Sequence, residues 1–168
     1  MTEASAARKR DDDWASKLLS SSAGHQGPLP HKRLPPRAGR AGLVLIADDN
    51  RDARELYGLY LRHVGFSVEL VANGLEAVDA AMKLRPDVIV MDLSMPWLDG
   101  IEATRCLKSS SRTSSIPVVL LTGYFHKAIA GGAREGGVDL FLTKPCLPED
   151  LETHVRQLLE RRGAPSSR

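Results

Sequence analysis

Apolar residues recur along this sequence in two alternating patterns. Short continuous apolar runs, which are typical of buried parallel strands, are each followed by a stretch whose apolar residues return at helical spacing. The order predicts five strand–helix units. The predicted strands span residues 43–47, 66–71, 87–91, 116–121 and 138–143, and the predicted helices span 52–64, 74–84, 100–108, 124–136 and 148–161.

Residues that begin or end helices support this division. Asn73 is a natural N-cap for the second helix, and Pro86 ends that helix. Gly65 suits the position after the first helix, and Pro148 suits the first turn of the last one. The fourth helix is predicted to be weak because Gly131 and its neighbour Gly132 lie inside it.

Strict alternation of strands and helices predicts an α/β fold, a doubly wound parallel sheet with helices on both faces. In such sheets the ligand site lies outside the carboxyl ends of the strands. Residues at those ends are therefore the first candidates for chemistry.

Composition is that of a globular protein. Hydrophobic residues make up 42% of the 168 residues and charged residues 26%, and the net charge of +2 is too small to indicate nucleic-acid binding. No apolar run is long enough for a membrane span, and the first thirteen residues lack the apolar stretch of a secretory signal. Two cysteines, Cys106 and Cys146, are too few for a disulfide framework. We expect a cytoplasmic protein without a membrane partner.

Charge divides the chain into unequal parts. Residues 1–42 carry eight Lys/Arg against four acids and several prolines, so we expect a disordered basic, Pro-rich tail. Residues 43–161 form the predicted domain, and residues 162–168 a disordered C-terminal tip. The tail is too short and polar for a DNA-binding fold, so we expect no DNA-binding domain.

Polar residues of matching chemistry follow four of the five predicted strands. Asp48 and Asp49 follow the first strand, Asp92 the third, Thr122 the fourth and Lys144 the fifth. Three convergent carboxylates repel one another unless a cation lies among them, and oxygen ligands suit Mg²⁺. A carboxylate at such a site can act as a nucleophile toward a phosphoryl group, whose oxygens Lys144 and Thr122 can hold.

In this pattern, residues 43–161 resemble the receiver domain of two-component response regulators. The resemblance implies a flavodoxin-like (βα)5 fold with strand order 2-1-3-4-5. The stretches that carry it are the Asp48-Asp49 pair, DVIVMDLSMPWLDG at 87–100 with Met95-Pro96 and Asp99-Gly100, Leu121-Thr122-Gly123, and DLFLTKP at 139–145.

The resemblance also implies a phosphoacceptor and a metal site. Asp92 corresponds to the aspartate that receives the phosphoryl group. Asp49, Asp92 and the backbone carbonyl of Ser94 correspond to the Mg²⁺ ligands, and Asp48 is expected to position the metal through water.

Further roles are implied for residues of the later strands. Lys144 corresponds to the phosphoryl-binding lysine, and its bond to Pro145 to the family's cis peptide. Thr122 and Phe141 correspond to the hydroxyl and the aromatic residue of the conformational switch. Cys146 departs from the family pattern, which has an aromatic residue there, and is expected to loosen the local packing.

The implied function is a stand-alone response regulator in a two-component phosphorelay. Such a phosphoprotein accepts its phosphoryl group from a histidine kinase or a histidine phosphotransfer protein. It is not a dedicated enzyme, although it can catalyse its own phosphorylation and dephosphorylation. A downstream protein is expected on the face made by the fourth helix, the fifth strand and the fifth helix. Because the charged pattern of the dimerising DNA-binding subfamily is not evident in 124–159, we expect a monomer or a weak dimer.

Two alternatives remain open at this point. A phosphatase of the haloacid-dehalogenase type also uses a strand-end aspartate and Mg²⁺. It needs a second aspartate two residues later, where this chain has Ser94, and it needs room for a cap domain. A degenerate receiver that serves only as a scaffold is disfavoured because Asp49, Asp92, Thr122 and Lys144 are all present.

Overall fold

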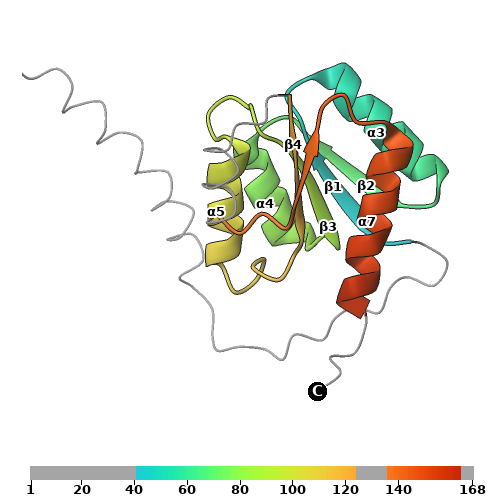
Figure 1. The fold of residues 1–168 in the computed structure, drawn as a ribbon. Helices are drawn as coiled ribbons and strands as arrows, with labels where there is room; N and C mark the ends of the chain where they lie inside the picture. The colour runs from blue at the N-terminus through green and yellow to red at the C-terminus, as the bar shows by residue number, and fades with distance from the viewer. Residues whose placement is uncertain (1–40, 124–135, 164–168) are drawn as a thin grey trace, which may run out of the picture. The chain divides into compact units, whose positions relative to one another are not determined.

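The computed structural model describes residues 41–123 and 136–163, which contain one sheet of five parallel strands with helices on both faces (Figure 1). The strand order is β2-β1-β3-β4-β5, so the predicted fold is confirmed. The elements are β1 Leu43–Ala47, α3 Arg51–His63, β2 Ser67–Val71, α4 Gly74–Leu84, β3 Val88–Asp92, α5 Gly100–Ser109, β4 Val118–Thr122, β5 Leu140–Thr143 and α7 Pro148–Gly163.

Burial of the strands follows their place in the sheet. Every residue of β3 and β4 is buried, and so are the last four residues of β1. The edge strands β2 and β5 are mostly half-buried. Continuous apolar runs therefore mark the three central strands, whose two faces are both covered by helices.

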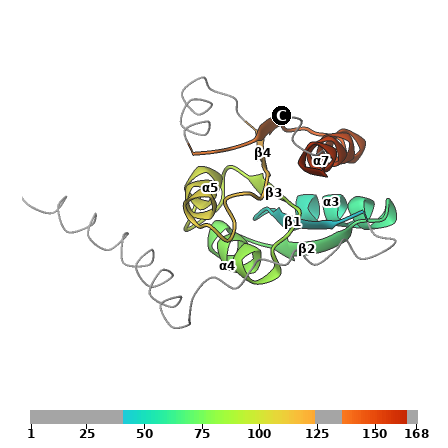
Figure 2. The ribbon, with the colours of Figure 1, turned by 90° about the horizontal axis from the view of Figure 1, so that it is seen from below.

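Helices cover the sheet in two pairs (Figure 2). Helices α3 and α7 contact each other on one face, and α4 contacts α5 on the other. Between α3, α7 and the sheet lies a buried cluster that includes Leu61, Leu151 and Val155 from the helices and Val90 and Leu121 from the strands. This packing holds the carboxyl ends of the central strands in fixed positions at one edge.

Capping residues act largely as the sequence predicts. The side chain of Asn73 accepts a hydrogen bond from the Glu76 N–H at the start of α4, and Arg85, with φ of 50°, ends that helix just before Pro86. Gly65 follows α3 with φ of 102°. Helix α3 begins at Arg51, one residue before the predicted start, because the Asn50 side chain accepts from the Ala53 N–H and caps it.

The described residues extend two positions beyond the predicted range of 43–161 at each end. Ala41 donates its N–H to the Gly65 carbonyl, the Gly42 carbonyl accepts from the Ser67 N–H, and α7 continues to Gly163. The remainder of the predicted tail, at 1–40, lies outside the described residues. So do nearly all of the predicted fourth helix and the last five residues of the predicted tip.

Candidate functional site

Three carboxylates meet at the carboxyl edge of the sheet. Asp48 and Asp49 follow β1, and Asp92 ends β3, which is the neighbour of β1 in the sheet. One carboxylate oxygen from each lies within 4.8 Å of the other two. Asp48 and Asp92 are buried, whereas Asp49 is exposed. The convergence predicted from the strand ends is therefore present.

Lys144 extends over this group from the loop after β5. Its Nζ lies 2.7 Å from Asp48 Oδ2 and 2.7 Å from Asp92 Oδ1. The peptide bond between Lys144 and Pro145 is cis, as the resemblance implies. The sequence predicts the lysine at this site but not its double pairing.

The pKa values of Asp92 and Lys144 are both raised, but for different reasons. Burial raises the pKa of Asp92 above its ordinary value, and the hydrogen bonds from Lys144 and from the Ser94 N–H offset this rise only in part. Burial acts to lower the pKa of Lys144. Its hydrogen bonds to Asp48 and Asp92 outweigh that effect and raise the pKa, so the lysine keeps its charge at neutral pH.

Backbone N–H groups orient two of the carboxylates, and one arginine binds the backbone beside them. The Asn50 N–H donates to Asp48 Oδ1 at 2.9 Å, and the Ser94 N–H donates to Asp92 Oδ2 at 2.8 Å. Arg54 donates from its guanidinium to the Asp48 carbonyl at 2.5 Å. Sequence reasoning missed Arg54, and its only signal is its place in the first turn of the helix that follows the aspartates.

The loop after Asp92 explains the Met-Pro…Asp-Gly stretch. Trp97 has φ of 67° and is 79% exposed. The N–H of the following residue, Leu98, donates to the Pro96 carbonyl and closes a tight turn around Trp97. The Asp99 side chain accepts from two N–H groups at the start of α5. A Cβ at position 100 would collide with the Asp92 carbonyl, so only glycine lets α5 begin this close to β3.

Thr122 and Phe141 lie on one face of neighbouring strands. Thr122 ends β4, is buried, and pairs in register with Thr143, while Phe141 pairs with Leu120. Paired residues of parallel strands point to the same face, and so do residues two apart in one strand. Phe141 pairs with Leu120, which lies two residues before Thr122, so Thr122 and the half-buried Phe141 share a face. The Thr122 carbonyl also accepts the Lys144 N–H at 2.8 Å. Thr122 therefore adjoins the carboxylate group, and Phe141 lies further back along β5.

Cys146, which follows the Lys144-Pro145 bond, is half-buried. It packs against the buried cluster between α3, α7 and the sheet. Its carbonyl accepts a hydrogen bond of 2.9 Å from the hydroxyl of Tyr57, which is 6% exposed. This link between α3 and the loop that carries Lys144 has no signal in the sequence.

The donor set fits a hard divalent cation. Carboxylate oxygens are the preferred ligands of Mg²⁺, which is usually held by one or two carboxylates and keeps several waters. The exposed position of Asp49 leaves that side of the cluster open to solvent. Together these groups form a site at which a phosphoryl group could be received by a buried carboxylate beside a fixed ammonium.

Comparison with known proteins agrees with this geometry. The family model described as response regulator receiver domain matches residues 44–156. Response regulator MprA from Mycobacterium sp. (strain KMS) is 37% identical over 118 residues, which cover 70% of this chain. These residues cover 50% of that protein, so the chain spans about half the length of the curated relatives it matches.

Two solved structures illustrate the likeness. The receiver domain of a signal transduction histidine kinase from Syntrophus aciditrophicus has a TM-score of 0.68 and 37% identity, and the match covers 76% of this chain and 96% of that one. The receiver domain of the sensor histidine kinase PA1611 from Pseudomonas aeruginosa PAO1 has a TM-score of 0.66 and 28% identity, with 71% and 98% covered. That structure is described as having a magnesium ion coordinated in its active-site cleft.

Proposed function

We propose that this chain accepts a phosphoryl group on Asp92 in a two-component phosphorelay. The chain belongs to the family of response regulator receiver domains, and this membership is the basis of the proposal. The donor is a histidine kinase or a histidine phosphotransfer protein. The family is one of signalling proteins, so the chain's own output is a change in protein contacts rather than turnover of a small substrate. No helix among the described residues is both long enough and apolar enough to cross a membrane. From the signalling role of the family we infer a cytoplasmic site of action.

One observation carries this proposal. The buried Asp92 carboxylate lies 2.7 Å from the ammonium of Lys144, and the carboxylates of Asp48 and Asp49 lie beside it. An acceptor with a raised pKa is a better nucleophile when ionised, and the neighbouring ammonium favours that ionised form. The arrangement supports phosphoryl transfer to Asp92 rather than to Asp49, which is exposed.

The transfer itself is a displacement at phosphorus. An oxygen of the Asp92 carboxylate forms the new P–O bond while the P–N bond of the donor phosphohistidine breaks, and the electron pair stays on the histidine nitrogen. Lys144 exchanges its contact with Asp92 for one with a phosphoryl oxygen, while its contact with Asp48 keeps it at the edge of the sheet.

Mg²⁺ fits the same group of residues. Asp49, Asp92 and the backbone carbonyl of Ser94 would hold it, with Asp48 acting through water, and the bound ion would offset the negative charge of the phosphoryl oxygens. The magnesium described for the PA1611 receiver domain supports this assignment. Asp48 is already paired with Lys144, which favours the indirect role for it.

The conformational response is proposed to pass from Thr122 to Phe141. Phosphorylated Asp92 gains negative charge, and the Thr122 hydroxyl can donate to a phosphoryl oxygen. Because Phe141 shares the face of Thr122 on the neighbouring strand, movement of the threonine changes the space open to the aromatic ring. A downstream protein would read this change on the face that includes β5 and α7. None of the assigned residues lies in 1–42 or 162–168, so we propose that the receiver function resides in 43–161.

Phosphotransfer from purified kinases tests the proposal. Histidine kinases and histidine phosphotransfer proteins, each labelled with ³²P, are mixed with the full chain with Mg²⁺ or with EDTA. We expect at least one donor to pass its label to the chain within seconds to minutes, only with Mg²⁺, and not to the Asp92→Asn variant. Failure of every donor, while a known receiver domain accepts label in parallel, would contradict the phosphorelay role.

A further inference from the structure

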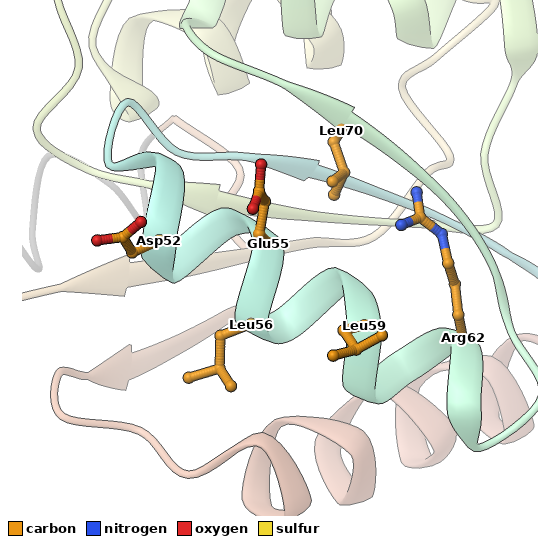
Figure 3. Close-up of a pocket in the computed structure, with 6 residues that line it drawn as sticks. All are labelled: Asp52, Glu55, Leu56, Leu59, Arg62 and Leu70. Atoms are coloured by element: carbon orange, nitrogen blue, oxygen red, sulfur yellow. The ribbon is translucent and has the colours of Figure 1, made fainter.

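Helix α3 has an outer side that faces solvent and an inner side that faces the rest of the fold. Leu56 and Leu59 lie on the outer side, away from the sheet (Figure 3). Tyr57, between them in the sequence, is buried on the inner side. Arg54 lies three residues before Tyr57, so the two side chains are neighbours along the helix. Both make hydrogen bonds at the edge of the sheet where the three carboxylates meet.

Arg54 and Tyr57 each bind a backbone carbonyl next to a charged residue of the site. Arg54 donates from its guanidinium to the carbonyl of Asp48. The Tyr57 hydroxyl donates at 2.9 Å to the carbonyl of Cys146, two residues after Lys144. Asp48 and Lys144 are joined to each other by an ion pair of 2.7 Å. One side of α3 therefore holds the backbone beside both partners of this ion pair.

The loop that follows Lys144 is tied to three different elements. At its start the Lys144 N–H donates to the last residue of β4 at 2.8 Å, and at its end the Leu147 carbonyl accepts an N–H from within α7. Pro145, between them, has no N–H to donate. The Tyr57 hydroxyl joins the loop to α3 at the residue after this proline, Cys146. Loss of the hydroxyl would therefore free the loop from α3 close to Lys144.

The path of this loop decides where the ammonium of Lys144 lies. A lysine side chain is long and flexible, so simultaneous contacts of 2.7 Å with Asp48 and Asp92 depend on a fixed backbone. In the proposed transfer the same ammonium turns to a phosphoryl oxygen, and a misplacement of about 1 Å can slow a reaction by roughly a hundredfold. Burial raises the pKa of Tyr57, so its hydroxyl keeps the proton that it donates to the loop.

We propose that Tyr57 is a positioning residue for the phosphorylation of Asp92. Its hydroxyl fixes the carbonyl of Cys146, and the loop then presents Lys144 to the carboxylates and to the incoming phosphoryl group. This role rests on the proposed function, because it acts on that transfer through the lysine. The ring of Tyr57 belongs to the buried cluster between α3, α7 and the sheet. Tyr57→Phe keeps the ring and removes the hydroxyl, so it tests the positioning role apart from the packing.

Acetylation of lysines measures the position of Lys144 before any phosphoryl group is bound. The full chain, Tyr57→Phe and Tyr60→Phe are treated with trace acetic anhydride, and each lysine is quantified by mass spectrometry. The Lys144 side chain is 26% exposed and Lys83 is 70% exposed, so Lys83 serves as an internal reference. We expect Lys144 to react roughly fivefold faster in Tyr57→Phe, the factor to which one net hydrogen bond corresponds. Tyr60→Phe, which removes a bond to Glu152, should match the parent, and unchanged reactivity of Lys144 in Tyr57→Phe would overturn the proposal.

Phosphorylation kinetics test whether this position matters for the transfer. Labelling by acetyl phosphate is followed by intact mass at saturating Mg²⁺, at a temperature where every variant is fully folded. We expect the maximal rate of Tyr57→Phe to fall roughly fivefold, with Mg²⁺ affinity, read from Trp97 fluorescence, unchanged. Lower stability alone would not slow a fully folded protein. An equal rate for Tyr57→Phe would overturn the positioning role, whereas a parent chain that takes up no label would contradict the proposed function.

A double-mutant cycle identifies the group through which Tyr57 acts. Tyr57→Phe should slow Lys144→Met much less than it slows the parent, because the lysine is no longer there to be positioned. Thermal melts establish that Lys144→Met is folded. Additive effects of the two substitutions would mean that the hydroxyl acts by another route and would overturn the proposal. If Lys144→Met takes up no label, the acetylation of Lys144 in Tyr57→Phe decides between the outcomes.

Discussion

The ammonium of Lys144 lies 2.7 Å from the carboxylate of Asp92, although β4 separates the strands that precede the lysine and carry the aspartate. The lysine reaches Asp92 because it directly follows β5, at the same carboxyl edge of the sheet where β3 ends. It bonds to Asp48 at the same time. Lys144 thus links the ends of β1 and β3, and a phosphoryl group on Asp92 would compete for one of its two contacts.

Replacing the acceptor should stabilise the protein when no metal is bound. Burial raises the pKa of Asp92, so the folded state binds a proton on this group more tightly than the unfolded state does, and stability falls as the pH rises through the folded pKa. Asp92→Asn removes the ionised form. We expect its melting temperature in EDTA at neutral pH to exceed that of the parent by a few degrees.

The pH dependence distinguishes this cause from a change in packing. The difference between Asp92→Asn and the parent should shrink as the pH falls toward the ordinary aspartate pKa of about 4, where the parent is also neutral at this position. Thermal melts across that range measure it. A gap that stays constant with pH would mean that ionisation of Asp92 is not the cause.

The two aspartates after β1 should differ in their effect on Mg²⁺ binding. Asp49 is exposed beside the cluster, whereas Asp48 is buried and bonded to Lys144. We expect Asp49→Asn to weaken Mg²⁺ affinity by roughly tenfold or more, and Asp48→Asn to weaken it less. Fluorescence of the exposed Trp97, in the loop after Asp92, should report the titration. Asp79→Asn, on the outer side of α4, serves as a control, and equal weakening by both site variants would reject the ranking.

Substitution of the switch residues, Thr122 and Phe141, should change the conformational response without preventing phosphorylation of Asp92. Thr122→Ala and Phe141→Ala leave Asp92 and Lys144 in place, so each variant should still be phosphorylated to the same final extent. Each should weaken the response to beryllofluoride, a phosphoryl mimic, measured as amide chemical-shift changes in β5 and α7. If both variants respond like the parent, coupling of the threonine to the aromatic ring is not how the signal leaves the site.

The hydroxyl of Tyr57 should contribute to stability more than that of Tyr60. The Tyr57 hydroxyl is bonded to the Cys146 carbonyl beneath the Lys144 loop, and its ring is almost fully buried. Tyr57→Phe leaves that carbonyl without its donor and should lower the free energy of unfolding by about 1 kcal/mol. Tyr60→Phe removes a bond to Glu152 near the surface and should cost less. Urea denaturation of the two variants compares them, and an equal loss would argue against the buried link.

Much of the fold could be predicted because the signals are local. Apolar runs fit the fully buried β3 and β4, and Asn73 and Gly65 fit their capping positions because each depends on neighbours in the chain. The observed strand boundaries differ from the predicted ones by up to two residues. The sheet's register, rather than apolarity, decides where pairing begins, as at Leu140.

The site could be predicted in its membership but not in its contacts. Parallel strands bring their carboxyl ends to one edge, so residues at those ends meet whatever the side-chain details. The bond from Tyr57 to the Cys146 carbonyl joins residues 89 positions apart, and the double pairing of Lys144 depends on the path of its loop. Such long-range contacts leave no periodicity in the sequence.

Intact-mass spectrometry after incubation with acetyl phosphate and Mg²⁺ tests the assignment of Asp92 most directly. The parent chain should gain a single phosphoryl group that survives acid and is lost in base, and so should Asp79→Asn, in which an exposed aspartate is replaced. Asp92→Asn should gain none, because its amide cannot serve as the nucleophile. Labelling of Asp92→Asn to the same extent as the parent would contradict the account.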